Sequence, residues 1–145
     1  MKNRLKQFLS IKAWFNDVAL LLLRVACALM ILHGWSKFND FSEGSKDWPD
    51  PFLVGTTVSY ALTVFAELFC SIFVVIGLFT RIALVPLIIC LIVIVFNVHG
   101  GDPLEDKEHG LLYLLIYLSL FLTGPGKYSL DSLIEKRWKN DDESH

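Results

Sequence analysis

The most constraining feature of the chain is an apolar run near its start that is long enough to cross a lipid bilayer. Residues 18–38 have the sequence VALLLLRVACALMILHGWSKF. A hydrocarbon core about 30 Å thick needs roughly 20 predominantly apolar residues in helical form, so this run predicts a membrane-spanning helix. Its ionisable residues Arg24, His33 and Lys37 need partners or a cavity, because a charge in hydrocarbon costs roughly 2.5 to 3.5 kcal/mol on insertion scales.

Further apolar runs follow at residues 56–79 and 82–98, the first interrupted only by Glu67. The last run, 111–122, is too short to cross alone, so we expect its helix to begin near Asp106 and to end at the Gly-Pro-Gly sequence of residues 124–126. A chain of 145 residues that is 54% hydrophobic and 19% charged is typical of an integral membrane protein. The predicted fold class is an all-α membrane protein, a bundle of four transmembrane helices.

The distribution of Lys and Arg predicts the orientation of the bundle. Four lie before residue 18, one (Arg81) lies in the connection between the second and third apolar runs, and four lie after residue 126. The other side has only Lys37, Lys46 and Lys107. We therefore expect both termini in the cytoplasm. Three regions follow: a basic interfacial lead-in (1–17), the membrane domain (18–131) and a polar cytoplasmic tail (132–145) that frays after Trp138. The net charge of −2 gives no support for nucleic acid as a partner, whereas the lipid bilayer is one.

Several kinds of chemistry lack their sequence motifs. There is no Gly-rich phosphate loop, nucleophile elbow, Rossmann fingerprint or C-x-x-C-H haem attachment site. The cysteines, Cys27, Cys70 and Cys90, all lie inside apolar runs without a C-x-x-C pair, which favours small buried residues over a disulfide framework or a zinc cluster.

Polar residues converge on the predicted extracytoplasmic side of the membrane. His33 and Lys37 end the first helix, His99 ends the third, and Glu108 and His109 open the fourth. The residues could simply meet water at the interface. Alternatively, they could hydrogen-bond the carbonyls of a quinone or relay protons, or the histidines His33, His99 and His109 could bind a metal. On the fourth helix, a stripe at i, i+4 and i+8 could flank a flat ligand or simply pack: His109, Tyr113 and Tyr117.

The second predicted helix carries a polar stripe with helical spacing: Thr56, Tyr60, Thr63, Glu67 and Ser71. Such a face should point into the bundle. Glu67 then lies near the midplane, where Arg24 is its natural partner by depth, in a structural ion pair. The alternative is a proton-handling carboxylate in a ligand pocket. Arg24 and His33 are nine residues apart, so both can face one pocket only if the helix bends near Gly34.

The chain resembles the DoxX family of small bacterial membrane proteins. The resemblance extends over about residues 18–131 and is carried by these residues: Leu23-Arg24-Val25, the HGWSKF sequence of 33–38, Glu67, the GLFTR sequence of 77–81, His99, Glu108 and the TGPGKYSLD sequence of 123–131. It implies a four-helix membrane fold in the bacterial cytoplasmic (inner) membrane. Relatives include the quinone-reducing thiosulfate oxidoreductase subunit and members associated with membrane redox complexes.

From the residues and this resemblance together we expect a quinone-interacting component of a membrane redox system, with a quinone-linked oxidoreductase subunit as one form of it. Glu67 and His99 are the candidate catalytic residues, and the candidate cofactor-binding residues are His33, Lys37, Glu67, His99 and Glu108. The partner would be another redox protein or a second copy of the chain. Two alternatives stay open: a non-catalytic scaffold or assembly partner, and the histidine-based metal-binding protein.

Overall fold

The computed structural model describes residues 13–142, which form helices, turns and loops and contain no strand. The lead-in predicted for residues 1–17 falls mostly outside this range. In chain order the helices are α2 (Ala13–Ala26), α3 (Ala28–Asn39), α4 (Phe41–Gly44), α5 (Thr56–Val64), η1 (Phe65–Cys70), α6 (Ser71–Ile76), α7 (Thr80–Ile92), η2 (Val93–Val98), α8 (Leu104–Thr123) and α9 (Leu130–Asp142). Here η1 and η2 are π-helical turns that continue the α-helices before them.

Within the described range, three continuous helices are long and apolar enough to cross a membrane. They are Trp14–Asn39, Thr56–Ile76 and Thr80–Val98. The three apolar runs predicted from the sequence are therefore confirmed as helices. The fourth long helix, α8, has 20 residues and begins at Leu104, slightly earlier than predicted, with Glu105 and Asp106 in its first turn.

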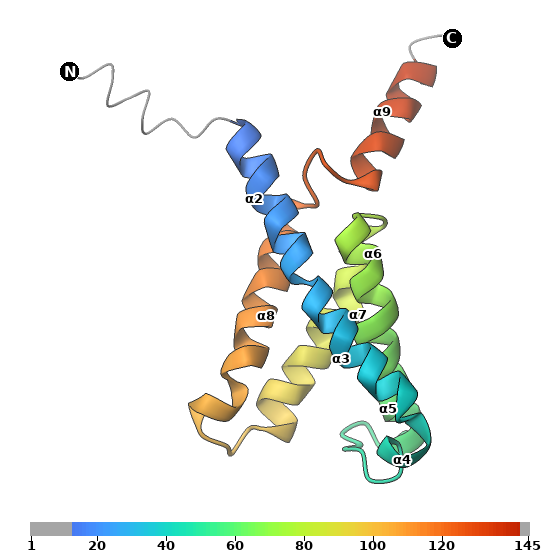
Figure 1. Cartoon of the computed structure of the whole chain (residues 1–145), viewed down its shortest axis with the longest axis vertical. Coiled ribbons are helices and arrows are strands. Elements are labelled where there is room, and N and C mark those ends of the chain that lie inside the picture. The colour runs from blue at the N-terminus through green and yellow to red at the C-terminus, as the bar shows by residue number, and fades with distance from the viewer. Residues whose placement is uncertain (1–12, 143–145) are drawn as a thin grey trace, which may run out of the picture.

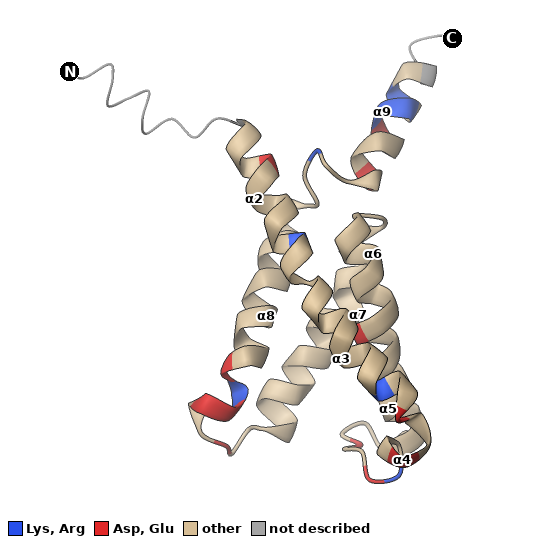
Figure 2. Cartoon of the chain, viewed as in Figure 1, with Lys and Arg blue, Asp and Glu red and all other residues tan. Residues whose placement is uncertain are grey.

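The four long helical segments pack as two pairs (Figure 1). α3 lies along η1, while α7 lies along α8, and α7 also contacts η1 and α6 to join the pairs. Both described termini lie at one end of the bundle, here called the termini end, and α4 and the 99–103 connection lie at the other, the loop end. Charged residues concentrate at the two ends (Figure 2). The core between them is mainly aliphatic, as expected for helices whose backbone polar groups bond internally.

The register between α3 and η1 is set by a close backbone contact at Gly34. A Cβ atom at this position would lie 2.5 Å from the backbone nitrogen of Leu68, so only glycine lets the two helices approach this closely. Ten residues earlier, the guanidinium of Arg24 lies against Gly77 instead. Since a helix rises 1.5 Å per residue, Arg24 lies about 15 Å from the level of Glu67 along the first helix.

The predicted Arg24–Glu67 pair is therefore wrong. Arg24 donates hydrogen bonds to the backbone carbonyls of Val75 and Tyr128, whereas Glu67 accepts one from Lys37. Arg24 and Lys37 are both cations on the first long helix, but the register between the helices places Lys37, and not Arg24, beside Glu67. Arg24 instead meets the carbonyls at the end of α6, where a cation interacts favourably with the partial negative charge of a helix C-terminus.

Arg24 belongs to a cluster that fastens α9 to the termini end, here called the termini-end lock and consisting of Arg24, Gly77, Tyr128 and Asp131. Gly77 ends α6 with a φ of 72°, a conformation that favours glycine. Its carbonyl accepts a hydrogen bond from the backbone N–H of Asp131. The Asp131 carboxylate accepts the backbone N–H groups of Phe79 and Thr80 and the Thr80 hydroxyl at 2.7 to 2.9 Å, which caps the start of α7.

The first long helix is interrupted at Cys27, between α2 and α3. A bend near Gly34 was the condition under which Arg24 and His33 could face one pocket, and the interruption lies before that position. Pro86 lies inside α7, as its seventh residue. The helix α9 continues past Trp138, after which the sequence predicts fraying, to Asp142.

Candidate functional site

A cavity of about 720 Å³ lies between the two helix pairs in the loop-end half of the bundle. Its lining comes from α3, α5, η1, α7, η2 and α8 and from the connection between α4 and α5. Most of these side chains are apolar or aromatic, and the polar ones are few: His33, Lys37, Ser59, Thr63, Glu67, Cys90, His99, His109 and Tyr113. A largely apolar cavity with a few polar groups is the usual form of a small-molecule site.

The structure brings four of the predicted site residues to this cavity: His33, Lys37, Glu67 and His99. On α3, Met30, His33 and Lys37 share one face because they follow i, i+3, i+7 spacing. Glu67 reaches the cavity from η1 and His99 from the end of η2. Both π-helical turns thus contribute to the wall, and such turns occur often at functional sites.

An ion pair forms the polar centre of the wall. Lys37 Nζ lies 2.7 Å from Glu67 Oε2, and the side chains are 22% and 6% exposed. Glu67 therefore has almost no contact with solvent, while the Lys37 side chain is partly exposed and lines the cavity. The ammonium also lies 5.6 Å from the centre of the Trp48 ring, a cation–π arrangement. A ligand oxygen that enters the cavity could thus accept a hydrogen bond from Lys37 without separating the ion pair.

The polar stripe predicted on the second helix does point inward. Four of its five residues, Tyr60, Thr63, Glu67 and Ser71, are less than 9% exposed, whereas Thr56, the first residue of α5, is only partly buried. Tyr60 donates from its hydroxyl to the backbone carbonyl of Lys37 at 3.0 Å, so the stripe also holds the end of α3 in place. The prediction that this face looks into the bundle is confirmed.

The rim of the cavity is the loop between α4 and α5, whose lining residues are Trp48, Pro49, Pro51 and Phe52. Asp50 anchors this rim: its carboxylate accepts the Ser59 hydroxyl at 2.6 Å and the backbone N–H groups of Val54 and Gly55 at 3.1 and 2.7 Å. The hydrogen bond from Ser59 is the main cause that lowers the pKa of Asp50, with the two backbone groups adding to it. Trp48 packs edge-on against Tyr60, with ring centres 5.0 Å apart.

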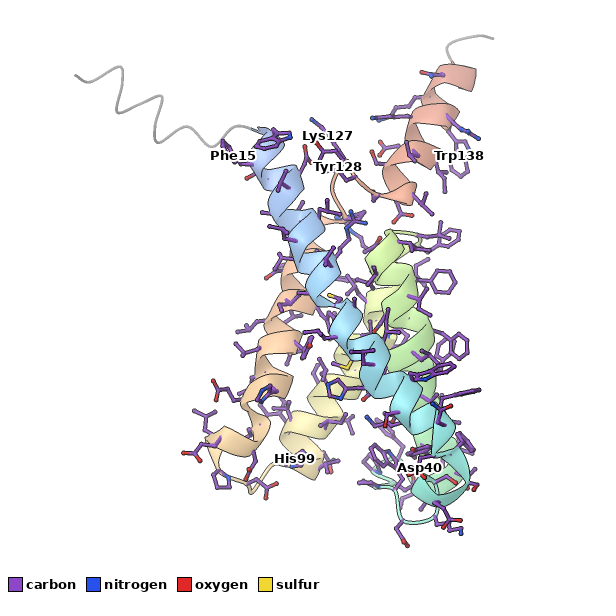
Figure 3. The ribbon with its side chains drawn as sticks, viewed as in Figure 1. Phe15, Asp40, His99, Lys127, Tyr128 and Trp138 are labelled. Carbon is purple, nitrogen blue, oxygen red and sulfur yellow. The ribbon has the colours of Figure 1, made fainter. Side chains whose placement is uncertain are left out.

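His99 marks the loop-end border of the cavity (Figure 3). Its Nδ1 lies 2.8 Å from Asp102 Oδ2, and both side chains are about half exposed, so the ring connects the cavity with the surface. Lys107 donates to the carbonyl of Gly100 at 3.2 Å, which ties the 99–103 connection to the start of α8.

The remaining predicted residues lie on α8 and point in different directions. His109 and Tyr113 line the cavity, but Glu108 does not and is exposed. Consecutive residues on a helix point about 100° apart, so Glu108 and His109 cannot share this face. Tyr117, the last member of that stripe, is fully buried in the core.

The three-histidine metal alternative lacks the required geometry. Within residues 13–142, no three His, Cys, Asp or Glu side chains come together closely enough to hold a metal ion. His33, His99 and His109 border the same cavity from three different helices without forming a ligand set.

Sequence reasoning missed several residues of the site. Trp48 and Phe52, for which the sequence predicts no role in the site, line the cavity, and so does Cys90, which is predicted to be a small buried residue. Cys27 and Cys70 are buried as expected. The spacing of Met30, His33 and Lys37 is the signal that could have identified their common face.

Comparison with known proteins identifies the family. The DoxX family model matches residues 19–100, more than half of the chain, and the TGPGKYSLD segment lies outside the match. The chain is also similar to a curated relative from Haemophilus influenzae (strain ATCC 51907 / DSM 11121 / KW20 / Rd) that is described as an uncharacterized protein. The identity is 30% over an alignment of 130 residues, and the alignment covers 83% of this chain and 86% of the relative. No solved structure matches the chain. The chain is therefore a membrane protein that belongs to the DoxX family.

Proposed function

We propose that the cavity binds the head group of a quinone and that the protein serves a redox system of the bacterial inner membrane. The observation that carries this proposal is the Lys37–Glu67 pair, with a 2.7 Å separation, on the wall of an otherwise apolar cavity of about 720 Å³. A quinone accepts two electrons and two protons and presents two carbonyl oxygens that need hydrogen-bond donors. The apolar lining suits its ring, and the polar residues suit its oxygens.

The residues that line the cavity would have separate roles in binding the quinone and in moving protons. Lys37 would donate to one oxygen, since its side chain is partly exposed and lines the cavity. His33, on the same face of α3, is a further donor. Glu67, 4% exposed, would hold or release a proton within the bundle, and His99 with Asp102 would exchange protons with the loop-end surface. Electrons would come from a redox centre on a partner protein.

The proposal includes a membrane topology. We propose that α8 is a fourth span beside the three apolar helices and that both termini are cytoplasmic. α8 has 20 residues, enough for a bilayer, and packs along α7 throughout the bundle. The excess of Lys and Arg at the termini end supports this orientation. The loop end, with the cavity, would then lie on the extracytoplasmic side.

The test is quinone binding to the purified protein in nanodiscs, compared among single variants. His33→Ala and His99→Ala should weaken saturable binding, whereas Glu67→Gln should retain binding but lose quinone-coupled turnover with the partner present. Glu108→Gln is the matched control, since Glu108 is exposed outside the cavity, and it should bind like the parent protein.

If the parent protein shows no saturable quinone binding, or if all four variants bind equally, the redox proposal fails. The Lys37–Glu67 pair would then act only to hold α3 on η1, as in a scaffold or assembly subunit.

A further inference from the structure

The C-terminal helix α9 carries an exposed apolar face that nothing in residues 13–142 covers. Its large apolar side chains are Leu130, Leu133, Ile134 and Trp138, which are 40%, 54%, 36% and 71% exposed. Their spacing places them on one side of the helix, which Arg137 shares. An exposed face dominated by large apolar side chains marks a contact surface.

The direction of α9 is fixed by the termini-end lock. Asp131, the second residue of α9, bonds to the start of α7 through its carboxylate and to the end of α6 through its backbone N–H. The helix therefore cannot turn its apolar face onto the bundle without breaking these bonds. Whatever covers this face must come from outside residues 13–142.

The bilayer is in the right place to cover it. Trp138 lies at the same level of the bundle as Phe15, Lys127 and Tyr128 (Figure 3). Phe15 and Tyr128 are 55% and 49% exposed, and Trp14, where the first apolar helix begins, is 55% exposed. Aromatic side chains at the ends of spans concentrate at the headgroup layer, so this level marks the membrane surface.

We propose that α9 is an interfacial anchor whose apolar face lies in the headgroup layer of the same bilayer that the protein spans. Leu130, Leu133 and Ile134 reach the acyl boundary beside the end of α6, and Trp138 lies among the headgroups. Arg137, which lies within this face, and Lys136, at its border, extend their long side chains to lipid phosphates. Lys139 is paired with Glu135 at 2.6 Å and belongs to the opposite, water-facing side.

The experiment measures contact with lipid at single positions of the full chain, one copy per nanodisc. A polarity-sensitive fluorophore is attached to Ile134→Cys, Trp138→Cys or Lys139→Cys in a background in which the native cysteines are alanine. The quencher is a nitroxide carried by the lipid, either near the headgroup or at the bilayer centre. Lys139 is the matched control, because it adjoins Trp138 but points about 100° away.

We expect headgroup-level nitroxide to quench the probes at 134 and 138 at least threefold more than the probe at 139. Bilayer-centre nitroxide should quench all three weakly. Equal quenching at 134 and 139 would overturn the proposal, because a second copy and a partner protein are both absent from a one-copy nanodisc. As a second variant, Leu133→Glu with Ile134→Glu should reduce quenching at 138 at least threefold while the bundle keeps its melting temperature; unchanged quenching would also contradict the proposal.

Discussion

Removing either member of the Lys37–Glu67 ion pair should lower the free energy of unfolding, and removing Lys37 should lower it more than removing Glu67. In Lys37→Met the glutamate, whose side chain is 6% exposed, loses its only ion-pair partner within the described residues. Stranding one partner of a buried pair costs on the order of 3 to 5 kcal/mol. In Glu67→Leu the Lys37 side chain, which is 22% exposed, can move its ammonium toward the cavity, so the loss should be smaller.

The double substitution should cost less than the two single costs added together. At a separation of 2.7 Å and an effective dielectric constant of about 20, the gross attraction is about 6 kcal/mol, most of which offsets the desolvation of the two charges. We therefore expect a coupling on the order of 1 to 3 kcal/mol. The assay is a double-mutant cycle of unfolding free energies in mixed micelles.

Arg24 supplies the control cycle. Its hydrogen bonds go to the carbonyls of Val75 and Tyr128, so Arg24→Met and Glu67→Leu should be additive within about 0.5 kcal/mol. Additive costs in the Lys37 cycle, or a larger coupling in the Arg24 cycle, would refute the register deduced from the structure.

Three further perturbations test other parts of the structure. Gly34→Ala places a Cβ 2.5 Å from the backbone of Leu68 and should cost about 1 to 3 kcal/mol by separating the helices, whereas Gly101→Ala, with nothing within 4 Å, should leave the melting temperature unchanged. Asp131→Ala removes the cap of α7 and should cost about 0.5 to 2 kcal/mol, measured by thermal unfolding; no loss would argue against the lock. The pKa of Asp50 is lowered from 3.8, chiefly by the Ser59 hydroxyl, so its contribution to the rim is complete above pH 3.8 and is lost as the pH falls through the lowered value. An acid titration of Trp fluorescence should show this step in the parent protein and not in Asp50→Asn.

The sequence was sufficient for the helices and for which residues face inward, because both follow from local patterns. Hydrophobic runs located the three apolar helices, and helical spacing oriented the stripe from Tyr60 to Ser71. These features depend on residues near one another in the chain. The family resemblance agrees with the family match over residues 19–100.

The ion-pair partner of Glu67 could not be predicted from the sequence, because it depends on how far one helix is shifted along the other. Arg24 and Lys37 are both cations on the first helix, and estimated depth favoured Arg24 for Glu67. The register was decided by a contact that has no charge, the approach of Gly34 to Leu68. The rim loop was missed for a related reason: only tertiary packing on Tyr60 turns Trp48 toward the cavity.

The π-helical turn at Phe65–Cys70 also has a genetic meaning. A single π-turn is equivalent to one extra residue inserted into an α-helix, since its hydrogen bonds enclose one more residue than the α-helical ones. Deleting one codon at the exposed Phe65 would therefore restore a regular α-helix without rotating the segments on either side relative to each other, because the π-turn already absorbs the extra residue. Ser59 and Tyr60 would still face the rim, and the segment after Cys70 would keep its contacts with Arg24 and α7. A shortened allele should therefore insert and fold with its bundle intact, and the change would be confined to the wall around Glu67.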